Sequence, residues 1–282
     1  MDQNTIVVSP MSQFISLEPG QTYSGTITVA NPSDATSDVT YSASVKPYNV
    51  TDQAYTADLA TMSNYSELVN WLTLDSSTGT LSPNSTAEIP FSITVPANAP
   101  AGGQYATIVV SQAPSTTDNN TVSSVVGLAS LIYADIAGET IHAGEVLDTT
   151  LPGFSLVTPV SITTTITNTG NVHDTAYINL TVTNTFTGEK IFPTSEDSST
   201  FSEVIMPDST RLIVRELTGL PPLGIVRIDQ TITYQGVDST FSQTLVLCPI
   251  WFIALVAFTI FSIFFALIFR ARSHRKTSQL ST

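Results

Sequence analysis

Cysteine is almost absent from this sequence. Cys248 is the single cysteine among 282 residues, and it lies at the edge of an apolar run near the C-terminus. No disulfide can therefore form within the residues that precede it, and thiolate ligands for zinc are missing there as well. We expect that part of the chain to be stabilised by packing alone.

Charged residues are also scarce, at 11 % of the chain, and they are distributed unevenly. The first 245 residues hold all 23 acidic residues and five basic ones, a net charge of −18, whereas the last 13 residues carry a net charge of +4. Contacts to phosphate depend on Lys and Arg, which the acidic part has in only five places. This composition excludes nucleic acid as a partner.

Side chains suited to catalysis or metal binding are few. The acidic part has two histidines, His142 and His173, without the spacing of a zinc site or of a nucleophile and its base. Residues 196–198 (Glu-Asp-Ser) are acidic but lack the alternate-residue oxygen spacing of a calcium loop. We predict that the protein is not an enzyme and that it binds no cofactor and no metal.

One long hydrophobic run stands near the C-terminus, at residues 246–269. Its 24 residues include no charge, and as a helix they would extend about 36 Å, more than the roughly 30 Å of a hydrocarbon core. The run is apolar on every face, and no other segment has a helical pattern that could cover it. We therefore predict a transmembrane helix rather than the buried core helix of a soluble protein.

Four basic residues follow the run directly and predict its orientation. They are Arg270, Arg272, Arg275 and Lys276. Short flanks rich in Lys and Arg stay cytoplasmic, and Trp251 at the other end suits the outer interface. We predict a single-pass plasma-membrane protein with an extracellular N-terminal ectodomain and a basic cytoplasmic tail at 270–282.

Export of such an ectodomain requires a signal. The N-terminal sequence MDQNTIVVSPMSQF has no apolar stretch of signal length. Three explanations remain open: a signal peptide that has been removed, a start placed too late, or a tail-anchored protein.

The first 245 residues show the alternation of β-strands bounded by Pro, Gly, Asn and Asp. In 86–95, for example, Phe91, Ile93 and Val95 alternate with polar residues, so one face of the strand enters a core. The predicted strands span residues 6–9, 14–18, 24–30, 38–47, 86–95, 104–112, 123–136, 160–167, 175–183, 201–206, 210–217, 225–234 and 240–247. This spacing predicts an all-β fold of two tandem Ig-like sandwiches, residues 1–140 and 141–245.

Two internal correspondences suggest duplication. The segment Thr26–Val45 parallels Thr163–Val182, each with a strand, an Asn-led turn and a second strand. Residues 99–110 parallel 220–232, where a turn with Pro and Gly leads into an alternating strand. We expect the boundary between the halves to fall between Ala137 and Leu151, with a short linker there, because Gly138, Gly144, Pro152 and Gly153 cluster around this stretch.

A family resemblance rests on three stretches of the first half: SLEPGQTYSGTITVANPSD, SELVNWLTLDSSTGTLSPNSTAEIPFSITVPANAPAGGQYATIVV and ASLIYADIAG. Over about 120 residues these resemble the N-terminal domain of WxL-interacting cell-surface proteins and related bacterial Ig-like domains. Animal extracellular Ig-type domains usually carry a Cys pair, so the missing cysteines also favour a bacterial surface protein. The resemblance implies that the first domain contacts peptidoglycan and that the second contacts a protein partner.

The richest candidate binding surface is the long connection at residues 46–75. Tyr48, Tyr55, Tyr65 and Trp71 are interspersed there with Asp, Asn and Thr. Aromatic rings beside polar groups can stack on sugars and hydrogen-bond their hydroxyls. The alternative is that these rings, Trp71 above all, cover the core beneath the connection.

We therefore predict a non-enzymatic bacterial surface protein that binds cell-wall polymer or another surface protein. Two alternatives remain: a sensory or accessory subunit of a membrane complex, and a carbohydrate-binding module. The apolar run has no charged residue and no Gly-x-x-x-Gly pattern, so strong pairing with other helices has no support in the sequence. That favours simple anchoring.

Overall fold

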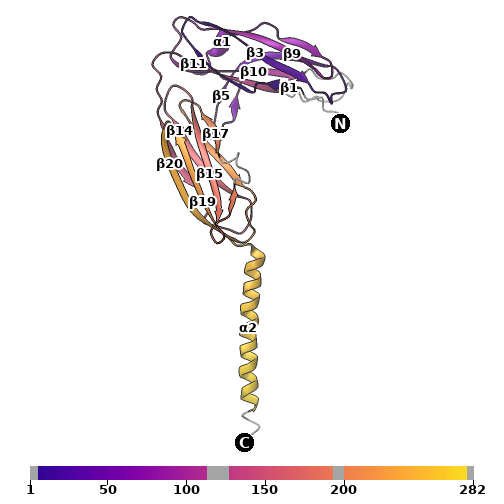
Figure 1. The fold of residues 1–282 in the computed structure, drawn as a ribbon, viewed down its shortest axis with the longest axis vertical. Coiled ribbons are helices and arrows are strands. Elements are labelled where there is room, and N and C mark those ends of the chain that lie inside the picture. The colour runs from indigo at the N-terminus through magenta and orange to yellow at the C-terminus, as the bar shows by residue number, and fades with distance from the viewer. Residues whose placement is uncertain (1–5, 113–126, 193–199, 278–282) are drawn as a thin grey trace. The chain divides into compact units, whose positions relative to one another are not determined.

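A computed structural model describes residues 6–112, 127–192 and 200–277, with side chains up to residue 268 (Figure 1). The chain is mostly β, with one long apolar helix near its C-terminus, which confirms this part of the predicted fold class. The candidate calcium residues 196–198 and the first four residues of the predicted strand 123–136 lie outside the described residues.

The chain divides into two compact units. Unit 1 comprises residues 1–145, 166–175 and 204–212, and unit 2 comprises residues 146–165, 176–203 and 213–282. Two segments from the second half of the sequence therefore belong to unit 1. The prediction of a linker at 137–151 is wrong in part. Gly144–Thr150 forms a strand, β12, which pairs with β14.

The first half of the sequence forms two main sheets. One has the strand order β1-β3-β9-β7, and the other has the order β2-β11-β10-β4-β8. Their bounds are β1 Val7–Ser9, β2 Ser12–Leu17, β3 Thr22–Asn31, β4 Val39–Pro47, β7 Leu72–Leu74, β8 Thr78–Leu81, β9 Ser85–Thr94, β10 Gly102–Gln112 and β11 Gly127–Ile136. The predicted connection at 46–75 is shorter than expected, since it contains the hairpin β5 (Asn49–Val50) and β6 (Ala57–Asp58), the short helix α1 (Leu68–Trp71) and β7.

The second half forms a three-stranded sheet and a six-stranded sheet. Their orders are β12-β14-β18 and β13-β20-β19-β15-β16, with β17 also paired to β15. The bounds are β13 Phe154–Ser155, β14 Val160–Asn168, β15 Asp174–Asn184, β16 Lys190–Phe192, β17 Thr200–Ile205, β18 Ser209–Leu217, β19 Gly224–Tyr234 and β20 Val237–Leu247. Each of the predicted strands overlaps one of the observed strands.

Alternating side chains build the core of unit 1. In β9, Ile89, Phe91 and Ile93 are buried, and Ile27 in β3 packs in the same cluster. Gly25 lies opposite Phe91 in the β3–β9 ladder, and a Cβ there would stand 2.3 Å from the Phe91 ring. Glycine at this position lets the ring cross the neighbouring strand, as expected where side chain and backbone approach closely.

Matching asparagines end β3 and β14, at the point where the sequence suggested duplication. Asn31 and Asn168 are each 1 % exposed. Asn31 donates its amide hydrogens to the carbonyls of Ser37 and Leu81, at 3.0 and 3.1 Å. Asn168 likewise donates to Val172 and Ile205, at 2.8 and 3.0 Å. Each side chain thus ties its own turn to a distant carbonyl, which explains why both turns begin with Asn.

Unit 2 has a smaller, mainly aliphatic core. Its members include Ile162 in β14, Leu180 in β15 and Ile228 in β19. A buried amide interrupts this core, because Gln230 donates to the hydroxyl of Thr164 at 2.9 Å. Such a bond is needed, since an unpaired buried amide is costly.

The C-terminal helix α2 spans Ile250–Thr277. Residues 250–268, with a mean hydropathy of 2.6 and no burial, are long and apolar enough to cross a membrane. Arg270, Arg272, Arg275 and Lys276 continue the same helix, and their side chains lie outside the described part of the chain.

Candidate functional site

Three of the four predicted binding residues gather in one place within unit 1. Tyr48, Tyr55 and Tyr65 pack, half-buried, against the buried residues Tyr105, Tyr133 and Met206. We call this group the tyrosine cluster. Trp71 is not part of it: it lies in α1 and is 9 % exposed in the aliphatic core of unit 1. A ring so buried cannot stack on a sugar, so the alternative, in which Trp71 covers the core, describes its position.

Tyr55 uses its hydroxyl inside the protein. That hydroxyl accepts the Met206 N–H at 2.8 Å and lies 2.6 Å from the Ser209 Oγ. Ser209 in turn donates to the Met206 carbonyl at 2.7 Å, so the Tyr55 hydroxyl is the donor to Ser209. The Arg211 guanidinium lies 4.5 Å from the centre of the Tyr55 ring, a cation–π contact. Tyr55 therefore holds the turn at 206–209.

The other tyrosine hydroxyls are also bonded within the unit. Tyr65 donates to the Asp208 carboxylate at 2.5 Å, and Tyr48 hydrogen-bonds Tyr133. The hydroxyl of Tyr105 accepts the backbone N–H of His173 at 2.9 Å. These tyrosines have a structural role, because their hydroxyls already form hydrogen bonds within the unit and a ligand would have to replace them.

Burial changes the acidity of the cluster. It raises the pKa of Tyr105 and Tyr133 well above the ordinary value, and it also raises the pKa of Tyr48 and Tyr55. For Tyr65, burial and then the Asp208 carboxylate raise the pKa to about 12. All five phenols are thus neutral near pH 7, so the cluster offers no phenolate to a reaction.

Both described histidines contact carboxylates. The Nδ1 of His142 lies 2.7 Å from Asp174. The Nδ1 of His173 lies 3.2 Å from the Asp135 Oδ1, an ion-pair distance without a hydrogen bond to that oxygen. The His173 Nδ1 also lies 3.3 Å from the Tyr105 hydroxyl.

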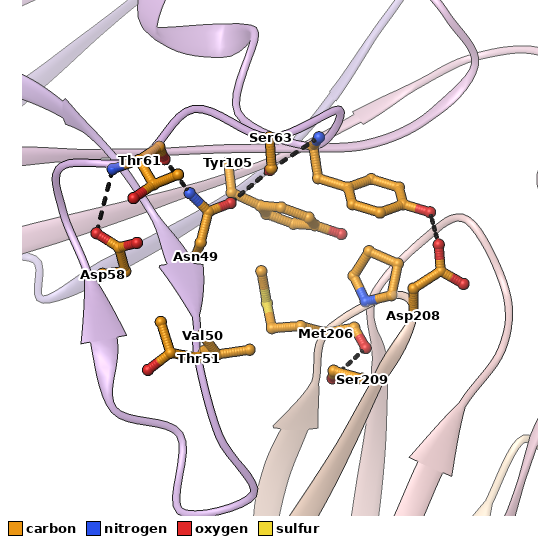
Figure 2. A pocket seen from close by; sticks show the side chains of 12 residues that line it. Asn49, Val50, Thr51, Asp58, Thr61, Ser63, Tyr105, Met206, Asp208 and Ser209 are labelled. Atoms are coloured by element: carbon orange, nitrogen blue, oxygen red, sulfur yellow. Dashed lines mark hydrogen bonds between the residues drawn. The ribbon is translucent and has the colours of Figure 1, made fainter.

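A cavity of about 310 Å³ opens beside the tyrosine cluster (Figure 2). The cavity is lined by the β5–β6 hairpin, the loop that follows it, Tyr105 and the 206–209 turn. The lining residues are Asn49, Val50, Thr51, Asp58, Thr61, Ser63, Tyr65, Tyr105, Met206, Pro207, Asp208 and Ser209.

Hydrogen bonds within the lining fix the loop of this cavity. Asn49 donates to the Thr61 carbonyl and accepts from the Ser63 hydroxyl, as Figure 2 shows. Asp58 accepts the backbone N–H groups of Ala60 and Thr61, at 2.9 and 3.1 Å. An Asx-type turn of this kind holds the polar groups in place without a ligand.

Two acidic side chains, Asp58 and Asp208, line the cavity. Hydrogen bonds from the Thr61 side chain and from the Ala60 and Thr61 backbone lower the pKa of Asp58, so it is a carboxylate at neutral pH. A glycosidase needs a carboxylic acid with a raised pKa beside its partner carboxylate. With Asp58 and Asp208 both lining it, the cavity suits ligands that donate hydrogen bonds, and it disfavours anions.

Sequence reasoning missed the residues that complete this site. Met206, Asp208 and Ser209 stand more than 140 positions after the tyrosines that they contact. The one local signal is the turn-like sequence PDST at residues 207–210. It predicts a turn but does not indicate which residues the turn contacts.

Comparisons with known proteins give the following. No protein-family model and no curated protein matches the chain. Among solved structures, the class 5 fimbriae chaperone CfaA is 13 % identical and matches with a TM-score of 0.41, covering 86 % of this chain and 99 % of that chain. The E. coli chaperone DraB is 15 % identical with a TM-score of 0.38, covering 86 % and 98 %. The Salmonella enterica complex of the SafA pilin with the SafB chaperone matches at 12 % identity and a TM-score of 0.40, covering 86 % and 96 %. At such low identity and TM-score, the partners of these proteins are not transferred to this chain.

Proposed function

We propose that this chain is a non-enzymatic, single-pass surface protein. In this proposal α2 crosses the plasma membrane, residues 1–245 form an extracellular region of two tandem Ig-like sandwiches, 1–140 and 141–245, and the tail is cytoplasmic. The extracellular region binds cell-wall polymer or another surface protein, as the resemblance to WxL-interacting proteins implies.

One observation carries the proposal: an apolar, wholly exposed helix separates two parts of opposite charge. None of residues 250–268 is buried within the protein. A segment this apolar is unstable in water, and a bilayer of roughly 30 Å matches its length. The net charges of −18 before it and +4 after it favour the orientation with the tail inside.

Topology on intact cells tests the proposal. Protease added outside should remove the acidic region, and an epitope fused after Thr282 should be reached only after permeabilisation. Replacing Arg270, Arg272, Arg275 and Lys276 by Gln should produce a mixed orientation with unchanged membrane association, because the flanking charges rather than the apolar length set direction. A tail epitope that is accessible on intact wild-type cells would contradict the proposal.

The cavity beside the tyrosine cluster supports a carbohydrate as the second candidate ligand class. Its lining combines an amide, hydroxyls and two carboxylates with the apolar side chains of Val50, Met206 and Pro207, which suits the hydroxyl and amide donors of a neutral sugar. The hydroxyls of the predicted tyrosines are hydrogen-bonded within the unit, so the proposed sugar contacts are made by the polar groups of the lining.

Binding of neutral N-acetylglucosamine oligomers to the full-length protein in phosphatidylcholine nanodiscs tests this ligand class. The Asp208→Asn variant keeps an acceptor for Tyr65 and should weaken binding about tenfold, because it removes a charged hydrogen-bond acceptor. Asp75→Asn, outside the cavity lining, is the matched control and should bind as the wild type does. Equal affinity of both variants would exclude the cavity as the sugar site.

A further inference from the structure

The end of unit 2 next to α2 differs from the rest of that unit. The short strand β13 runs parallel to β20, with Phe154 opposite Val246. The Cys248 N–H donates to the Ser155 carbonyl at 3.0 Å. Because α2 begins at Ile250, two residues after Cys248, this loop lies within about 10 Å of the start of the helix.

Two further turns reach the same end of the six-stranded sheet. Gly224 pairs with Leu247, so Leu223 lies beside the last residue of β20. The Thr185 N–H donates to the Ile225 carbonyl at 3.0 Å, and Ile225 pairs with Val246. The turn that carries Phe186 is therefore level with the point where β20 leads to the helix.

These turns expose large apolar side chains. Val157 is 71 % exposed and Phe186 is 76 % exposed. We call the whole set the apolar rim, and its members are Phe154, Leu156, Val157, Phe186 and Leu223. Isolated exposed apolar residues need no explanation, but a group at one end of a domain marks an interaction site.

Charge is nearly absent from the same turns. Residues 151–159 and 218–223 contain no ionisable side chain, and residues 185–192 contain one acid and one base, Glu189 and Lys190. The rim is thus neutral in a region whose net charge is −18. Neutral apolar loops can enter the boundary between lipid headgroups and acyl chains at little electrostatic cost.

We propose that the apolar rim lies in the interfacial layer of the bilayer leaflet that α2 enters. This inference rests on the proposed membrane span of α2, because the chain and the hydrogen bonds above fix the rim next to the start of that helix. Trp251, in the first turn of α2, belongs at the same depth, since tryptophan favours the interface. The rim therefore acts as a second, shallow contact with lipid.

Depth-dependent quenching in the full-length protein tests the inference. Single cysteines replace Val157, Val237 or Ile260 in a Cys248→Ser background and carry an environment-sensitive fluorophore in phosphatidylcholine vesicles. Val237 is the matched control, being 65 % exposed but ten residues away along β20, which places it about 33 Å from Leu247. Quenchers are attached to the lipid either near the headgroup or near the bilayer centre.

We expect the label at position 157 to be quenched by the shallow quencher at least about twofold more than the label at 237. The label at 260 should be quenched by the deep quencher. If 260 is quenched and 157 is not, the rim inference is overturned while the span stands. If 260 escapes both quenchers, the span itself fails. A blue-shifted but unquenched label at 157 would mean that protein covers the rim, and would also overturn the inference.

A variant set gives an independent readout. With the fluorophore at Leu223→Cys, the triple variant Phe154→Ser, Val157→Ser and Phe186→Ser should lose most of the shallow quenching. Leu147→Ser, an exposed apolar position in β12, should leave it unchanged. Undiminished quenching in the triple variant would contradict a role for the rim in lipid contact.

Discussion

The two units bury different kinds of side chain. Unit 2 packs mainly aliphatic residues from its two sheets, with a buried hydrogen bond from the Gln230 amide to the Thr164 hydroxyl. Unit 1 has a larger aliphatic core and, beside it, the tyrosine cluster, whose hydroxyls hold the turn at 206–209 and the backbone of His173.

The difference shows how a unit can depend on residues distant in the sequence. Aliphatic packing needs only shape and tolerates repacking, whereas a hydroxyl that bonds a backbone group requires one particular partner. Unit 1 should therefore be the more sensitive of the two to removal of remote segments and of single oxygen atoms.

Truncation should have the largest effect on the stability of unit 1 relative to unit 2. A fragment of residues 1–140 lacks 166–175 and 204–212, which belong to unit 1, and exposes Tyr105 and Tyr133. We expect its melting temperature to fall by roughly 10 °C or more below that of unit 1 in a 1–245 fragment. Calorimetry measures the two melting temperatures, and the fluorescence of a hydrophobic dye measures the apolar surface that each fragment exposes. Equal melting temperatures without dye binding would mean that the remote segments contribute nothing.

The matching asparagines allow the stability contribution of the same turn to be compared between the two halves of the sequence. Asn31→Ala and Asn168→Ala each leave two carbonyls without their side-chain donor, so each should cost about 2–3 kcal/mol. Asn168→Ala should cost more, because the Asn168 Oδ1 also accepts the Gly170 N–H at 2.9 Å, whereas the Asn31 Oδ1 has no partner. Denaturant unfolding of the two variants checks the order, and the reverse order would refute this reading of the turns.

Removing one oxygen from the tyrosine cluster has a smaller effect. Tyr55→Phe leaves the Met206 N–H without an acceptor and should destabilise unit 1 by about 1–2 kcal/mol. Tyr177→Phe, at a 54 % exposed position in unit 2, is the matched control and should change stability by less than about 0.5 kcal/mol. Chemical denaturation measures both, and equal effects would argue against a structural role for the Tyr55 hydroxyl.

Alkaline pH should produce the smallest difference, through Tyr65. Its folded pKa is about 12, above the unfolded value of about 10. The folded state therefore keeps the proton longer, and its advantage is complete below pH 10 and is lost as the pH rises toward 12. Melting in this window should fall less steeply for Tyr65→Phe than for the wild type. An identical pH dependence would show that Tyr65 is not coupled to folding.

Many of the strands could be predicted because the alternation of apolar and polar residues is visible in the local sequence. Strands such as β9 and β19 carry it along their whole length, and the apolar run before the basic tail needs no tertiary information. The strand β12, with the sequence GEVLDTT, escaped prediction because its residues are mostly exposed and polar. The short strands of the 46–75 connection escaped because two or three residues give no period.

The sequence predicted a binding surface at the tyrosines of the 46–75 connection, and their binding role stays a prediction. Tyr48, Tyr55 and Tyr65 do lie together, yet the sequence offered them to a ligand, whereas the structure uses their hydroxyls internally. Partners such as Ser209, 154 positions after Tyr55, cannot be inferred from spacing. The apolar rim could not be predicted for the same reason. Phe154 and Phe186 are brought to the end of unit 2 next to α2 by the pairing of β13 and β19 with β20 and of β15 with β19.

The ladder between β19 and β20 also has a mechanical consequence. Any pull on an anchored α2 passes through Cys248 into the end of β20, which is paired with β19 along eleven residues, from Gly224↔Leu247 to Tyr234↔Val237. When the pull runs along the strand, those backbone hydrogen bonds lie across the direction of force and bear the load together instead of opening one by one. In the proposed topology, β20 is therefore the strand that carries the load, and its pairing with β19 resists a pull along the strand axis.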